Sequence, residues 1–158
     1  MTKYILMVGV GLVFVVLWFR ERRRSIALRA MAERRGFVYL GGALPGSLRL
    51  RGTPIAQATS VWNVIDGDCD GFRVVTFDCR IGSGKHSSRR TVIAARGPDT
   101  PFSGVSPDFT VGHSGDWSIL YQPESFGVIP PGLMPVGEIE AYFDSMRSPK
   151  RSRKEVSR

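Results

Sequence analysis

An uninterrupted apolar run near the start of the chain constrains the fold more than any other feature. Tyr4 to Phe19 read YILMVGVGLVFVVLWF, sixteen residues with no charge and no proline. As an α-helix at about 1.5 Å per residue, the run is roughly 24 Å long, against a hydrocarbon core of roughly 30 Å. Lys3 and Arg20 flank the run, and their long side chains extend it by reaching toward the headgroups. The sequence therefore predicts an N-terminal transmembrane anchor over residues 1–19.

The two ends of this run have the chemistry of a membrane interface. Aromatic rings with a polar edge favour the headgroup level, and basic side chains favour anionic headgroups. The predicted membrane-interface residues are Lys3, Tyr4, Trp18, Arg20, Arg22, Arg23 and Arg24. Two alternatives for the run are a helix buried in a protein core and a cleaved signal peptide. The arginines that follow the run, with no Ala-x-Ala-like cleavage site among them, count against both.

The distribution of basic residues predicts an orientation. One lysine precedes the run, whereas seven arginines lie between Arg20 and Arg35. Because the basic flank of a membrane helix usually stays in the cytoplasm, we expect a single-pass protein of the cell inner membrane with its N-terminus outside. The rest of the chain is then cytoplasmic, and Cys69 and Cys79 are reduced thiols.

A basic juxtamembrane helix is expected over residues 20–35. Its sequence, RERRRSIALRAMAERR, is rich in good helix formers and contains no glycine or proline. Gly36 follows at the position where a left-handed C-cap residue ends a helix. The arginines either attract anionic lipid headgroups or only fix the orientation. One face is expected to dock on the following domain, and it comprises Leu28, Met31, Ala32 and Arg35.

The net charge of the chain is +8, with 22 Lys plus Arg against 14 Asp plus Glu, and it is concentrated near the termini. Residues 1–35 carry +6, residues 36–146 carry −3, and residues 147–158 carry +5. A nucleic-acid-binding domain carries its positive charge on the fold itself, so this distribution disfavours nucleic acid as a partner. The basic tail, 147–158, is expected to be disordered. It binds anionic lipid, binds RNA or only adds solubility.

Residues 36–146 are long enough for one domain, and their patterns predict an α+β fold with a mostly antiparallel sheet. Runs of β-branched and aromatic residues indicate strands at 37–40, 61–66, 72–81, 91–96 and 117–121. Apolar residues at helical spacing indicate a closing C-terminal helix over 136–146. Within 72–81 the alternation predicts a buried face and a solvated face. The buried face holds Val75, Phe77, Cys79 and Ile81, and the solvated face holds Val74, Thr76, Asp78 and Arg80.

The segment Asp66-Gly67-Asp68-Cys69-Asp70-Gly71 matches the first half of a calcium-binding loop. Its alternating carboxylates, Asp66, Asp68 and Asp70, are the candidate metal ligands, because hard cations prefer oxygen donors. The position of the bidentate glutamate is occupied by Phe77, and the flanks are strands where such a loop has helices. An acidic hairpin turn is the favoured alternative, since Asp and Gly are common turn residues.

Two further segments resemble catalytic motifs only in part. Gly82-Ser83-Gly84-Lys85 lacks both the first glycine of a phosphate-binding loop and the hydroxyl residue that follows its lysine. Gly112-His113-Ser114-Gly115-Asp116 has aspartate where a nucleophile elbow requires glycine. With only His86 and His113 available as bases, the sequence predicts no catalytic residue and no cofactor.

Several strand and helix segments together resemble a group of small bacterial membrane-anchored proteins of unknown function. The resemblance covers most of the chain, lies in strand and turn residues, and implies an anchor followed by a domain without any activity. The segments are Asn63 to Gly67, Val74 to Asp78, Thr91 to Ile93, Trp117 to Tyr121 and Met134 to Ala141.

The sequence thus predicts a non-catalytic binding or scaffolding module at the inner membrane. Its expected partners are the lipid bilayer, anionic lipid headgroups and an unidentified protein. The alternative is a membrane-tethered hydrolase or metal-dependent enzyme.

Overall fold

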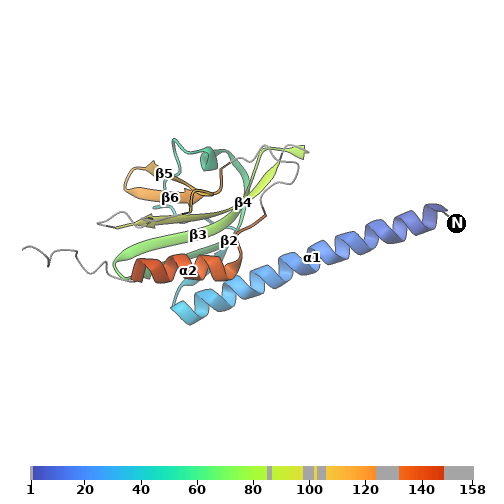
Figure 1. Cartoon of the computed structure of the whole chain (residues 1–158), viewed down its shortest axis with the longest axis horizontal. Helices are drawn as coiled ribbons and strands as arrows, with labels where there is room; N and C mark the ends of the chain where they lie inside the picture. Colours follow the sequence, from blue (N-terminus) through green and yellow to red (C-terminus); the bar gives the residue numbers. More distant parts are fainter. Residues whose placement is uncertain (1, 85–86, 98–101, 103–105, 124–131, 148–158) are drawn as a thin grey trace, which may run out of the picture.

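The computed structural model describes residues 2–84, 87–97, 102, 106–123 and 132–147, without the side chains at 2–6, 8, 10 and 147. It is an α+β structure, as the sequence predicts. A long N-terminal helix, α1 (Thr2–Arg35), and a C-terminal helix, α2 (Val136–Arg147), accompany one antiparallel sheet (Figure 1). The strands have the order β1-β2-β3-β4-β6-β5. Their bounds are β1 Val38–Gly41, β2 Ala58–Cys69, β3 Phe72–Ile81, β4 Ser88–Arg96, β5 Thr110–Ser114 and β6 Trp117–Tyr121.

Helix α1 ends where the sequence predicts, and the hydrogen bonds at its end show why. Gly36 has φ +71°, the left-handed conformation that glycine adopts without strain. Its N–H donates to the carbonyl of Glu33 at 3.2 Å, and the N–H of Phe37 donates to the carbonyl of Ala32 at 2.8 Å. This is the Schellman arrangement, and Phe37 and Ala32 share the hydrophobic cluster that such an ending favours. The chain therefore turns sharply from α1 into β1.

The turn between β2 and β3 is shorter than the sequence analysis expects. Asp70 (φ 46°) and Gly71 (φ 86°) form a two-residue connection between the paired residues Cys69 and Phe72. Positive φ at both central residues is typical of the type I′ turn, for which Asp-Gly is a preferred sequence. The expectation that β2 ends at Asp66 is wrong, because Asp-Gly alone reverses the chain and the strand continues to Cys69.

Both faces of the central sheet are covered, which the alternation in β3 does not reveal. Helices α1 and α2 lie on one face, shown below the sheet in Figure 1. There Leu28, Met31 and Ala32 of α1 are buried, as predicted. On the other face the β3 side chains pack against the segment that leads into β2. The apolar residues of that segment are Leu44, Leu48, Leu50 and Ile55, the last of which lies in a short 3-10 helix (Pro54–Gln57).

The predicted solvated face of β3 is therefore wrong for three of its four residues. Val74, Thr76 and Asp78 are each 1% exposed, and only Arg80 is exposed. The two helices cover this face, and its polar groups are satisfied inside the protein. The Thr76 hydroxyl donates to the carbonyl of Val92 at 2.9 Å, and Asp78 has four hydrogen bonds, which are described below.

The N-terminal half of α1 extends away from the sheet and α2 (Figure 1). Eight consecutive large apolar side chains there, Leu12 to Phe19, are between 49% and 68% exposed. Soluble monomers rarely expose a continuous apolar surface of this kind.

Within the described part of the chain, no helix is both long and apolar enough to cross a membrane.

Candidate functional site

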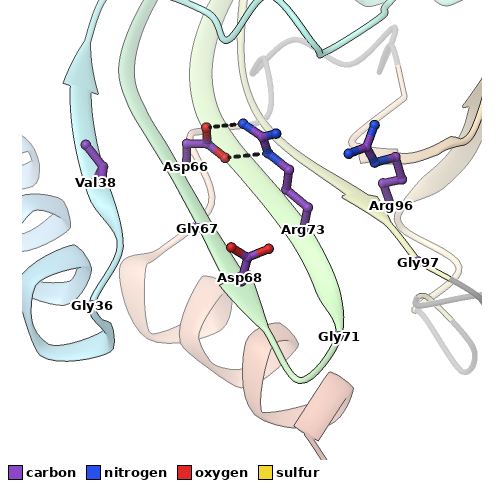
Figure 2. Close-up of a pocket in the computed structure, with 9 residues that line it drawn as sticks. All are labelled: Gly36, Val38, Asp66, Gly67, Asp68, Gly71, Arg73, Arg96 and Gly97. Atoms are coloured by element: carbon purple, nitrogen blue, oxygen red, sulfur yellow. Dashed lines mark hydrogen bonds and ion pairs between the residues drawn. The ribbon is translucent and has the colours of Figure 1, made fainter.

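The acidic segment of β2 lines an open polar pocket of about 770 Å³ at one end of the sheet (Figure 2). The pocket lies at the end where β2 turns into β3, and residues from four neighbouring strands or their flanks form it. Its walls carry two carboxylates and two guanidinium groups, and glycines keep it wide. The lining residues are Gly36, Val38, Asp66, Gly67, Asp68, Gly71, Arg73, Arg96 and Gly97.

Two of the glycines that line the pocket are required by aromatic rings packed against them. A Cβ atom on Gly67 would lie 2.2 Å from the Phe37 ring, and one on Gly97 would lie 2.2 Å from the Phe72 ring. Such distances are far inside van der Waals contact, so neither position accepts a side chain without displacing its ring. These glycines thus have a packing role besides shaping the pocket.

Asp66 is held by an arginine inside this pocket. Its Oδ2 accepts from Arg73 Nη2 at 2.8 Å and its Oδ1 accepts from Arg73 Nε at 3.2 Å (Figure 2). This bidentate geometry is the one that planar guanidinium groups favour with carboxylates. The hydrogen bond and charge of Asp66, with a smaller contribution from Asp68, raise the pKa of Arg73.

The three candidate metal ligands do not all line the pocket. Asp66 and Asp68 lie on β2 and line the pocket, whereas Asp70 occupies the turn. Both oxygens of Asp66 already accept from Arg73, which a cation would have to displace. Among the residues that the structure describes, no three His, Cys, Asp or Glu side chains group as a metal site. The metal hypothesis remains a prediction.

The partial catalytic motifs have structural partners. The Ser114 hydroxyl donates to the carbonyl of Arg51 at 2.7 Å, and His113 Nδ1 lies 3.4 Å from the Ser118 hydroxyl. Asp116 pairs with Arg96 at 3.3 Å, and the Arg96 guanidinium lies 5.3 Å from the centre of the Trp117 ring. Lys85 and His86 lie outside the described residues.

An extensive polar cluster among the described residues is one that sequence reasoning missed. It joins α1 to the face of the sheet that was expected to be solvated, and its centre is Asp78. Arg24 donates to Asp78 through Nε and Nη2, each at 2.8 Å. Asp78 also accepts from Thr91 at 2.8 Å and from Asn63 at 2.9 Å. Both carboxylate oxygens therefore have two donors, which satisfies a buried charge.

The same cluster fixes the segment that precedes α2. Arg24 Nη1 donates to the carbonyl of Met134 at 2.6 Å, and the Met134 N–H donates to the Thr91 hydroxyl at 3.0 Å. The Thr91 hydroxyl also accepts from Arg24 Nη2 at 2.9 Å. Arg24 thus connects helix α1 with strand β4 and with the residues just before α2.

A strained residue in β2 completes the cluster. Asn63 has φ 55° and lies where the β2–β3 register shifts between Trp62 and Ile65. Its side-chain carbonyl accepts from the hydroxyls of Ser25 and Tyr39, each at 2.8 Å. A bulge of this kind turns a side chain away from the regular alternation. Here the bulge places Asn63 between α1, β1 and Asp78.

The predicted membrane-interface residues lie along the part of α1 that extends away from the sheet, or directly after it, with one exception. Trp18, Arg20, Arg22 and Arg23 are exposed, and the Arg22 guanidinium lies 5.2 Å from the Trp18 ring centre. The side chains of Lys3 and Tyr4 lie outside the described residues. Arg24 instead takes part in the buried cluster, with a side chain only 13% exposed. The residues next to Arg24 in the sequence, Arg22 and Arg23, are exposed arginines, so the sequence does not distinguish the buried one.

The buried thiol of Cys79 leads to a prediction about pH. Burial raises the pKa of Cys79 to about 12, while Arg90 opposes this shift and Asp78 adds to it. Between about pH 9 and pH 12 the unfolded chain loses this proton and the folded chain keeps it. The free energy of unfolding should therefore fall with rising pH in this window, by at most about 1.4 kcal/mol per pH unit from this group.

The measurement is urea unfolding of the full chain in detergent at several pH values from about 8 to 11. Other groups titrate in the same range, including Tyr142, whose pKa is raised by burial and by Glu138 and Asp108. The contribution of Cys79 is therefore the difference in slope between the natural chain and Cys79→Ala. Equal slopes would contradict the prediction.

Comparison of the chain with protein-family models, with curated proteins and with solved structures finds no match.

Proposed function

We propose that the protein is a single-pass membrane protein that holds a small α+β domain at the cytoplasmic face of the inner membrane. In this proposal the domain is a non-catalytic binding or scaffolding module. The observation that carries the proposal is the division of α1 into two halves. Leu12 to Phe19 are exposed and apolar, whereas the half from Arg24 to Arg35 is docked on the domain.

The free half of α1 supports membrane insertion through its composition and exposure. The apolar run from Tyr4 to Phe19 is flanked by Lys3 and Arg20, residue types whose long basic side chains can extend a short membrane helix. With the Trp18 ring near one end, the run has the amphipathic flanks typical of membrane helices. Burial of this surface in lipid removes an exposure that is costly in water.

The pocket at the far end of the sheet supports a binding role. It is open and polar, and residues of the four neighbouring strands β1, β2, β3 and β4 or of their flanks line it. Asp68 presents a carboxylate there and Arg96, which also pairs with Asp116, presents a guanidinium group, so a small polar ligand or a peptide with both charges fits its chemistry.

Membrane extraction of full-length chains tests the anchor. The natural chain should remain in the membrane fraction after alkaline carbonate, and Leu12→Lys/Val16→Lys should be released. Each lysine near the centre of a membrane helix costs about 2.5–3.5 kcal/mol of insertion free energy. The matched control is Ile26→Lys, which places a lysine at a 60% exposed apolar residue of the docked half.

The control variant should stay in the membrane fraction. Release of the natural chain, or retention of the double variant, would contradict the anchor. For the orientation, a reporter that is active only outside the cytoplasm and is fused after Arg158 should remain silent. An active reporter would reverse the topology.

A further inference from the structure

One end of the domain lies at the level where the apolar half of α1 ends. Glu21 of α1 forms an ion pair with Arg89 at the start of β4. Glu21 is two residues beyond Phe19, a distance of about 3 Å along a helix axis. The start of β4 is therefore level with the end of the apolar run. Figure 1 shows the connected ends of β3 and β4 directed the same way as the N-terminal half of α1.

Two tryptophan–arginine pairs lie at this level, one on the helix and one on the sheet. The Arg22 guanidinium is 5.2 Å from the Trp18 ring centre, and the Arg89 guanidinium is 5.1 Å from the Trp62 ring centre. Tryptophan and arginine both combine an apolar body with donors that suit the headgroup region. Among the described residues, Trp62 Nε1 and Arg89 Nε are buried and have no hydrogen-bond acceptor, so the exposed parts of the two side chains are what the face presents. The sheet thus repeats the interfacial chemistry of the helix.

The exposed charged side chains that the structure describes at this end are basic. Arg80, at the end of β3, is exposed, and so are Arg20, Arg22 and Arg23 of α1. The acidic residue Glu21 is neutralised by Arg89. At the other end of β3, roughly 33 Å away at 3.3 Å per residue, the turn carries exposed Asp68 and Asp70. The hairpin therefore has a basic end near the apolar helix and an acidic end far from it.

We propose that this end of the domain, the headgroup face (Trp62, Arg80, Ser83 and Arg89), lies on the anionic lipid headgroups of the membrane that holds α1. The inference rests on the proposed membrane anchor and adds a second contact, through the sheet. The exposed Arg80 guanidinium binds lipid phosphate, and the contact turns the pocket toward the aqueous phase. Charge complementarity and continuity with the anchor identify the occupant as the bilayer.

The test uses the full chain in liposomes that contain about one-third anionic lipid. Two variants, Ser83→Cys and Ser145→Cys, each carry a fluorophore on the introduced cysteine. Lipids with a nitroxide on the headgroup quench a fluorophore that lies close to the membrane surface. Ser83 is exposed on the headgroup face, and Ser145 is exposed on α2. The native thiols, Cys69 and Cys79, are 1% and 0% exposed and should not react. We expect strong quenching at Ser83→Cys and weak quenching at Ser145→Cys.

Charge reversal then separates binding from proximity alone. Arg80→Glu in the Ser83→Cys background should lower the fraction of domains in contact by about fivefold or more, since each basic residue favours the anionic surface. Arg49→Glu, an exposed arginine outside the headgroup face, should leave quenching unchanged. Neutral lipid or high salt should act like Arg80→Glu.

The failure of this inference is distinguishable from the failure of the anchor. A chain that stays with the liposomes in flotation, but whose two labels are quenched equally or independently of lipid charge, would overturn the headgroup face and keep the anchor. A chain that does not float with the liposomes would overturn both.

Discussion

Replacing Arg24 with alanine is expected to lower the free energy of unfolding by about 3–5 kcal/mol, the range for removal of one partner of a buried ion pair. Asp78 is 1% exposed, and the loss of Arg24 removes two of its four donors together with the paired positive charge. Asn63 and Thr91 would still donate to it, but neither carries a positive charge. The measurement is urea unfolding of the full chain in detergent, followed by tryptophan fluorescence, to which the buried Trp117 contributes.

The matched control for Arg24 lies on the same helix. Arg34 pairs with Glu140 at 2.6 Å, but its side chain is 61% exposed. Arg34→Ala should therefore change the free energy of unfolding by less than about 1 kcal/mol. The double variant Arg24→Ala/Asp78→Ala should be destabilised by less than the sum of the single variants, because it leaves no charge unpaired. If Arg24→Ala resembles Arg34→Ala, the cluster does not hold α1 on the sheet.

Phe143→Ala should also destabilise the protein by about 3–5 kcal/mol, through the cavity that loss of a buried ring leaves. Phe143 is fully buried under α1 and the sheet. Its ring lies 5.5 Å from the Phe37 ring at 74°, an edge-to-face contact, and the Arg35 guanidinium is 5.4 Å from its centre. The substitution therefore removes contacts from the end of α1 and from the start of β1 together.

The adjacent Tyr142 is the control, since it belongs to the same helix and its replacement also removes an aromatic ring in favour of alanine. Tyr142 is half-buried and contacts Phe109 at 5.8 Å. Tyr142→Ala should cost about half as much as Phe143→Ala or less, because less surface leaves water on folding. Thermal unfolding measured by near-ultraviolet circular dichroism compares the two. An equal loss would mean that α2 packs through a different face.

The elements of the fold that depend on local chemistry could be predicted from the sequence. Gly36 ends α1 because a left-handed residue is needed there, and the spacing of Ile139 and Phe143 places one face of α2 in the core. The two faces of β3 could not be assigned in the same way. The alternation in the sequence shows which side chains of β3 are polar. It does not show that α1, from the N-terminal part of the chain, covers the side that carries them. Asp78 was for that reason expected in water.

The candidate site shows the same limit. A lone aspartate within the apolar run of β3 was the one sign of the buried cluster, and its partner Arg24 lies 54 residues earlier in the chain. Arg24 belongs to a run of arginines that look alike in the sequence. Only the direction in which α1 crosses the sheet makes Arg24 different from Arg22 and Arg23. The bulge at Asn63 has no local sequence signal either, since asparagine is common in turns and unusual at positive φ within a strand.

The continuity of α1 has a mechanical consequence. Between residue 12 and residue 35 the helix contains no glycine or proline, so it has no residue type that usually permits a hinge. With the helix inserted, the domain and the apolar half move as one rigid lever. A change in bilayer thickness that tilts the helix by about 10° would swing the far end of a hairpin roughly 33 Å long by about 6 Å. The pocket at that end would thereby shift its position relative to the membrane in response to the lipid itself.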